Sequence, residues 1–243
     1  MTAVVVGTAD LRAALAALRG HLPAGQDAMY GWIRAEVTGP VLQLTVTDLR
    51  SAAIGIVSIL ENEDGEAGIF ELLPSEIAEL LLAFKAASGE DEIGPTLRID
   101  TTRVPSTALR FTDISGLWPG KSISFPRASL DPSDFPDVAT LFGRTLARTA
   151  APPERIITHG PALAAFAKAA AAYGQPLLVE GVSETGRTLL VSCGESFLGL
   201  LISADLDEDQ QAQVKQWREA WTRRLPATDD GEGMPSSLVG RRG

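Results

Sequence analysis

The side chains that most often carry enzyme chemistry are few in this sequence, and their spacing forms no catalytic group. The two histidines, His21 and His159, lie far apart, and neither belongs to a metal-binding spacing such as H-E-x-x-H. The single cysteine, Cys193, lies in an apolar segment, which is typical of a buried structural thiol rather than a nucleophile. We therefore expect no metal site, no cofactor and no enzymatic activity.

The acidic residues offer two further readings. Asp48 and Asp113 could be paired carboxylates for acid–base catalysis, but aspartate at the end of a strand more often forms a turn. The acidic run at residues 61–66 could hold calcium, yet it lacks the regular ligand spacing and the distal Glu of a calcium loop. A solvated hairpin tip is the favoured interpretation of that run.

Composition limits the class of protein. The chain has 243 residues, of which 45% are hydrophobic and 21% charged, as in an ordinary globular protein. A net charge of −10 and a pI near 4.7 exclude a simple basic nucleic-acid binder, but not an acidic protein whose basic residues share one face. No signal peptide or membrane-spanning run is found, so we expect a cytoplasmic protein without a membrane partner.

Hydrophobic spacing predicts the elements that position these residues. Helices are predicted at residues 11–22, 74–88, 134–148, 162–173 and 207–225. Strands are predicted at residues 2–7, 31–37, 41–47, 51–60, 96–101, 107–113, 121–125, 177–182, 188–193 and 197–203. We expect the first two helices to lie side by side on a curved antiparallel sheet and to bury Leu15, Leu18, Ile77, Leu80 and Phe84.

The order of these elements and four short segments resemble the sliding clamps of DNA polymerases, the bacterial processivity (beta-subunit-like) clamp in particular. The segments are Thr47-Asp48-Leu49 after a strand, the helix start at residues 73–81, the Phe135-Pro136 segment at 134–138, and the strand at 197–201. The likeness covers residues 1–204. It implies an α+β fold of clamp-like domains with paired helices packed on curved antiparallel sheets, in a short two-domain form similar to actinobacterial and phage proteins.

The same resemblance implies a domain plan. Residues 1–130 are expected to form one clamp-like domain, and residues 131–206 a shortened second one. A C-terminal helix at 207–225 and a disordered tail at 226–243 follow. With two domains in each chain, a closed ring of six domains needs three chains, a homotrimer.

A clamp-like protein holds or encircles duplex DNA without reading bases, and it binds DNA polymerase or other replication and repair proteins. Six cations on the predicted helices are the candidate phosphate contacts: Arg12, Arg19, Lys85, Arg144, Arg148 and Lys168. All of them except Lys85 are expected to point to one concave surface. The alternative for each is an ordinary solvated helix residue. Two other functions compete with this one: a clamp-fold binding module or regulator that no longer forms a ring, and an unrelated small-molecule enzyme.

The C-terminal helix has a narrow apolar stripe that includes Trp217 and Trp221. A helix with so thin a stripe needs tertiary packing to be stable. We expect both tryptophans to be buried, either against the chain's own second domain or in an interface with a neighbouring protomer.

Overall fold

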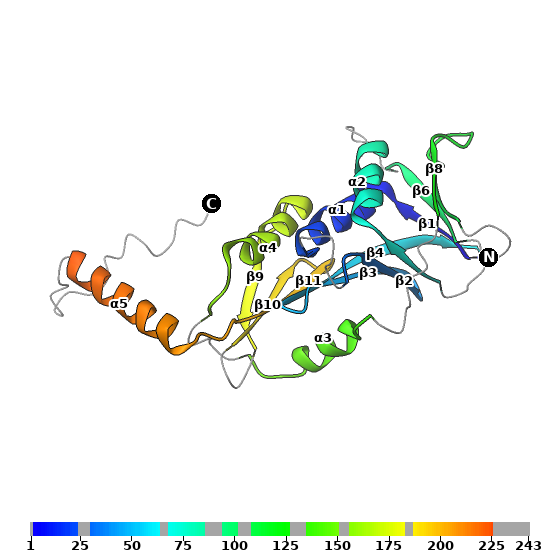
Figure 1. Ribbon diagram of the computed structural model, residues 1–243. Coiled ribbons are helices and arrows are strands. Elements are labelled where there is room, and N and C mark those ends of the chain that lie inside the picture. The colour runs from blue at the N-terminus through cyan, green and yellow to red at the C-terminus, as the bar shows by residue number, and fades with distance from the viewer. Residues whose placement is uncertain are drawn as a thin grey trace, which may run out of the picture. The chain divides into compact units, whose positions relative to one another are not determined.

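The computed structural model describes residues 2–23, 30–63, 68–85, 94–101, 108–126, 135–150, 156–182 and 187–225. Residues 1–204 form one compact unit, and residues 205–243 belong to a second. The fold is α+β, as predicted, with helices packed on a curved antiparallel sheet (Figure 1). The domain boundary expected at residue 130 and the tail at 226–243 lie outside the described residues. In the described ranges, no helix has the length and apolar character needed to cross a membrane.

The first part of the chain consists of two successive repeats of strand, helix and three strands. The first repeat is β1 (Thr2–Gly7), α1 (Thr8–Leu18) with the 3₁₀ turn η1 (Arg19–His21), β2 (Ile33–Thr38), β3 (Val41–Thr47) and β4 (Ser51–Asn62). The second is β5 (Ile69–Leu72), α2 (Pro74–Ala83), β6 (Thr96–Thr101), β7 (Ala108–Asp113) and β8 (Ser122–Pro126). The short strand β5 was not predicted from the sequence.

A shorter third set of elements follows. It comprises α3 (Val138–Leu146), α4 (Gly160–Tyr173), β9 (Leu178–Gly181), β10 (Thr188–Cys193) and β11 (Phe197–Ile202). The helix α5 (Glu208–Arg224) belongs to the second unit. Among the described residues, α4 and β9–β11 therefore supply one helix and three strands, against two helices and eight strands in residues 2–126.

The first two repeats exchange their first strands. β1 pairs with β6 of the second repeat, and β5 pairs with β2 of the first, so neither repeat has a complete sheet of its own. β4 joins the third set of elements to the first repeat, because it pairs with β1 and β3 of its own repeat and with β11 of the third set. Residues 52–58 pair with β3, Asn62 pairs with Val4 of β1, and Gly55 pairs with Phe197 of β11. Together with the exchanged strands, these pairings join all eleven strands of residues 1–204 in one continuous sheet.

Alternation along the strands decides which helix covers which face. On β4, Ala53 belongs to the larger core with α1 and α4, whereas Ala52 and Ile54 belong to a smaller core with Val138 and Phe142 of α3. Successive strand residues point to opposite faces of a sheet. α1, α2 and α4 therefore form a helix layer on one face, and α3 covers part of the other (Figure 1).

The packing of the helix layer confirms the predicted core. The five residues expected there are all at most 5% exposed: Leu15, Leu18, Ile77, Leu80 and Phe84. The main helical neighbour of α1, however, is α4 rather than α2. Close approach is possible because Gly20 has no side chain: a Cβ placed there would lie 3.1 Å from the Cα of Ala165 on α4.

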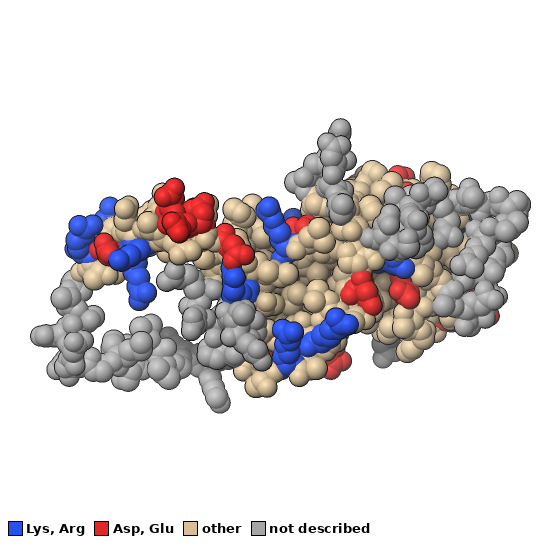
Figure 2. Space-filling view, turned by 60° about the horizontal axis from the view of Figure 1, so that its bottom comes forward, with Lys and Arg blue, Asp and Glu red and all other residues tan. Residues whose placement is uncertain are grey.

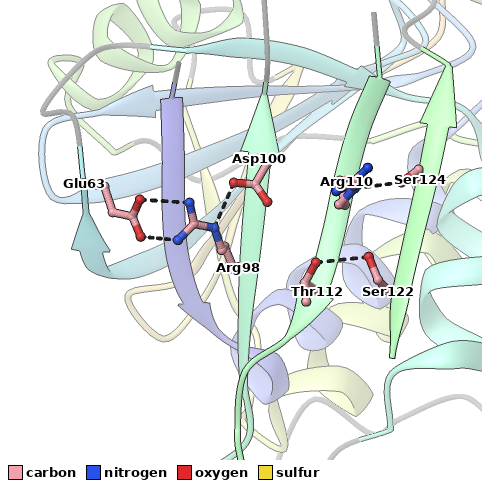
Figure 3. Close-up of polar contacts among 7 residues, drawn as sticks. All are labelled: Glu63, Arg98, Asp100, Arg110, Thr112, Ser122 and Ser124. Carbon is pink, nitrogen blue, oxygen red and sulfur yellow. Dashed lines mark hydrogen bonds and ion pairs between the residues drawn. The ribbon is translucent and has the colours of Figure 1, made fainter. Parts of the chain in front are cut away.

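The face opposite the helix layer is polar across β6, β7 and β8. Across β6, β7 and β8, outward side chains form a row of polar contacts (Figure 3). The guanidinium of Arg98 donates to the carboxylates of Asp100 and Glu63, and both contacts raise the pKa of Arg98. Thr112 and Ser122 share a hydrogen bond of 3.1 Å between their hydroxyls. Polar side chains of this kind suit a sheet face that is exposed to solvent, whereas the apolar part of the same face is covered by α3.

Candidate nucleic-acid interface

Two of the predicted DNA contacts, Arg19 and Lys168, lie on neighbouring segments of the helix layer. Arg19 begins η1 at the end of α1, and Lys168 is the one charged residue of α4. The two segments touch at Gly20, where an added Cβ would lie 3.0 Å from the Cδ of Lys168. Both side chains are exposed. The absence of a side chain at Gly20 thus lets the aliphatic stem of Lys168 lie on η1, beside the residue that carries the second charge.

Lys85 and Arg12 lie near the end of α2 in the same layer. Lys85 follows this helix and is exposed. Arg12 is half-buried, and its Nη1 atom donates hydrogen bonds to the carbonyl oxygens of Leu81 and Phe84. The last carbonyls of a helix have no partner within it, so Arg12 satisfies two of them and ties α1 to α2. This structural role was not predicted from the sequence.

Arg144 and Arg148 do not share a surface with the other four cations. α3 buries Val138 and Phe142 against Ile54, Leu190 and Leu200, on the sheet face opposite the helix layer. The expectation of one concave surface for five of the cations is therefore wrong for Arg144 on α3 and for Arg148, which follows two residues after the end of that helix. On the face that Figure 2 shows, basic side chains are interspersed with acidic ones and form no continuous basic surface.

His21 is a buried titratable group at the junction of α1, α4 and β11. It is 2% exposed, and its ring packs edge-on against Phe166 with centroids 4.7 Å apart. Nδ1 lies 3.3 Å from the hydroxyl of Ser51, and Nε2 has no hydrogen-bond partner among the residues that the structure describes. Burial lowers the pKa of His21 to about 4, with Asp48 raising it and Lys168 lowering it further. A neutral His21 therefore joins the third set of elements to the first repeat.

The residues considered for enzyme chemistry have structural roles. The Oδ1 atom of Asp48 accepts hydrogen bonds from the backbone of Arg50 and Ser51, and that of Asp113 accepts one from the backbone of Ser115. Both carboxylates thus form turns, as the favoured prediction had it. Cys193 is 1% exposed, and burial raises the pKa of its thiol. His159 is exposed and precedes α4. No cluster of metal-binding side chains is found within the described ranges.

Exposed tryptophans, each with an exposed leucine nearby in sequence, occur in two places among the described residues. The turn between β7 and β8 displays Leu117, which is 99% exposed, and Trp118, which is 83% exposed. Sequence reasoning missed this pair, although adjacent Leu and Trp in a turn bounded by Gly116 and Pro119 could have indicated it. On α5, Trp217 and Trp221 are 57% and 59% exposed, and their burial against a second domain or a neighbouring protomer stays a prediction.

Comparison with known proteins gives a likeness in structure alone, because no protein-family model and no curated protein sequence matches the chain. The DNA polymerase III beta subunit of Thermotoga maritima is 13% identical with a TM-score of 0.56, over 87% of this chain and 67% of the other. The sliding clamp of Pseudomonas aeruginosa is 16% identical with a TM-score of 0.54, over 92% and 73%.

A putative DNA polymerase III beta subunit from Eubacterium rectale is 10% identical with a TM-score of 0.56, over 96% of this chain and 76% of the other. Identities of 10–16% establish the fold and nothing finer. The arrangement of paired helices on a curved antiparallel sheet, predicted from the order of elements, is thus the fold of the bacterial DNA polymerase sliding clamps.

Proposed function

We propose that the chain is a clamp-like tethering protein that holds duplex DNA through its phosphates without reading bases. It acts in the cytoplasm as a non-catalytic platform for DNA polymerase or other replication and repair proteins. The observation that carries the proposal is the helix layer of a clamp fold, on which the exposed cations Arg19, Lys85 and Lys168 lie.

The charge distribution of the helix layer fits loose contact with DNA. The whole chain has a net charge of −10, yet α4 carries Lys168 and no acidic residue. Asp10 lies in the first turn of α1, at the opposite end of that helix from Arg19, and the exposed acid of α2, Glu79, lies in the middle of its helix. A few cations near phosphates give binding that is independent of sequence and sensitive to salt.

The test compares two charge-reversed variants in a DNA-binding titration on unrelated duplexes. Arg19→Glu with Lys168→Glu reverses the helix layer, and Arg144→Glu with Arg148→Glu makes the same charge change on the opposite face. We expect the first variant to lose binding on every duplex and the second to bind like the parent chain. For the parent chain, log affinity falls with log salt by about 0.9 per phosphate neutralised.

Two outcomes contradict the proposal. One is equal weakening by both variants, which indicates a general effect of net charge rather than a surface. The other is a parent chain that does not bind duplex DNA at low salt, or that binds one sequence far more tightly than others.

A second candidate function is a clamp-fold module or regulator that does not form a ring, and the short third set of elements favours it. A homotrimeric ring requires two complete domains in each chain, whereas α4 and β9–β11 form less than one in the described part of the sequence. Light scattering separates the two: a mass of three chains supports a ring, and a monomer supports the module. Retention on circular but not on linear duplex supports encirclement.

A further inference from the structure

We infer that α5 is a self-pairing helix that binds α5 of a second copy of this chain in antiparallel orientation. The helix runs from Glu208 to Arg224, and none of its residues is buried. Trp217, Trp221 and Leu225 are 57%, 59% and 60% exposed. Most helical stability in proteins comes from the packing of an apolar face. The exposed apolar face of α5 therefore needs a partner that covers it.

The spacing of the apolar residues fits a helix pair. Val214, Trp217 and Trp221 follow one another at intervals of three and four residues, as the a and d positions of a two-stranded coiled coil do. Continued at the same intervals, the stripe reaches Gln210 and Asp207 toward the start and Arg224 toward the end. Arg224 lies on the stripe, because its guanidinium is 5.7 Å from the ring centroid of Trp221.

An antiparallel arrangement gives every position of this stripe a suitable partner. Val214 then faces the partner's Trp217, and Trp221 faces the partner's Gln210. In the same register, Asp207 at the start of one helix lies opposite the partner's Arg224, so each end of the pair gains an acid–base contact. The carboxylate of Asp207 also caps its own helix, accepting a 2.8 Å hydrogen bond from the backbone N–H of Gln210.

Charge determines the orientation. The first turn of α5 carries Glu208 and Asp209 beside the capping Asp207, and its last turn carries Arg223 and Arg224. Antiparallel pairing places the acidic end of one helix beside the basic end of the other. It also points the two helix dipoles in opposite directions, which is favourable. Parallel pairing places acid against acid and base against base. A second copy of this helix is therefore the partner that its charges fit.

The inference is tested on the full chain without DNA, so that it does not depend on the proposed DNA binding. Sedimentation velocity over a concentration series is expected to show self-association. Trp217→Ala with Trp221→Ala should weaken that association by about tenfold or more, since buried aromatic anchors dominate interfaces. Leu82→Ala is the matched control, because Leu82 is a 76% exposed apolar residue on α2, and it should leave the association unchanged.

Charge exchange tests the orientation. Glu208→Lys with Asp209→Lys makes both ends of α5 basic, and Arg223→Glu with Arg224→Glu makes both ends acidic. Each variant alone should associate poorly, whereas an equal mixture of the two should associate again. A chain with all four substitutions should also associate, because its two ends again carry opposite charges. These charges are unfavourable for the helix dipole. Association of this variant would therefore show that the two-residue variants lose pairing and not the helix itself.

Three results overturn the inference. The parent chain sediments as a monomer at every concentration, or the tryptophan variant associates like the parent chain, or neither the mixture nor the fourfold variant recovers. The first indicates a different partner for the helix, and the second a different surface for association. The third indicates that the two helices do not pair in antiparallel orientation.

Discussion

Asp48 and Asp113 hold equivalent turns in the two successive repeats. Each follows a threonine at or next to the end of the third strand of its repeat, and each accepts a hydrogen bond through Oδ1 from the backbone N–H two residues later. The dipeptide Thr-Asp thus marks the same hairpin twice, at Thr47-Asp48 and at Thr112-Asp113. The two carboxylates act separately, each in its own hairpin.

Loss of the two carboxylates should have unequal costs. Asp48 accepts bonds of 3.0 Å from Arg50 N, 2.6 Å from Ser51 N and 3.1 Å from Ser51 Oγ, and Ser51 is buried. Asp113 has only the exposed Ser115 as such a partner among the described residues. Asp48→Ala should lower the free energy of unfolding by about 1–3 kcal/mol, and Asp113→Ala by less. Urea unfolding measures both, and equal losses would contradict this account.

Leu80 and Leu82 on α2 provide a matched pair for the core. Leu80 is 3% exposed, and Leu82 is 76% exposed. Leu80→Ala should lower the free energy of unfolding by about 2–5 kcal/mol, as large-to-small changes in a core do. Leu82→Ala should change it by no more than about 0.5 kcal/mol. A similar loss in both variants would show that the phase of this helix is wrong.

His21 should make stability depend on pH. Its pKa is lowered from 6.5 to about 4, so the unfolded chain binds the proton more readily than the folded chain does. The stabilising contribution is therefore complete above pH 6.5 and is lost as the pH falls toward 4. Between pH 6.5 and about 4, the melting temperature of the parent chain should fall more steeply with decreasing pH than that of His21→Gln. His159→Gln, at an exposed position, serves as the control, and parallel slopes for all three would refute the assignment.

Arg12 should contribute to stability rather than to DNA binding. Its removal leaves the carbonyl oxygens of Leu81 and Phe84 without this donor. Arg12→Ala should lower the free energy of unfolding by about 1–3 kcal/mol, and Arg12→Lys by less, because lysine keeps a donor at the end of a long stem. Arg19→Ala, which removes an exposed cation from the same face, should unfold like the parent chain. An Arg12→Ala variant of unchanged stability that loses DNA affinity would reverse the assignment.

Much of the fold could be predicted because the strands alternate and the helices carry apolar stripes. Residues 2–7, 41–47, 96–101 and 188–193 were predicted with the bounds that the structure has. β5 was missed because four residues, Ile69–Leu72, are too short for alternation to be visible. Its pairing with β2 depends on a strand exchange between repeats, which the local pattern does not encode.

The positions of the cations could be predicted only in part. The spacing of a helix shows which residues share its own face, but not which face of a sheet the helix covers. For α3 this depends on Ile54, Leu190 and Leu200, whose contacts with Phe142 are distant in sequence. Arg144 lies on α3, whereas Arg148 lies two residues past its end, so the prediction of one helix for both was wrong for Arg148. Both were also wrongly placed on the surface that carries Arg19 and Lys168.

The shared strand β4 has a consequence for how the chain is made on the ribosome. Its first half, Ser51–Gly55, pairs with β11, which is synthesised long after it. Synthesis at about 5–20 residues per second leaves that strand edge without its partner for on the order of ten seconds. Because a pairing so distant in sequence closes late, the nascent chain passes through a stage with an open apolar edge at Ala52–Ile54.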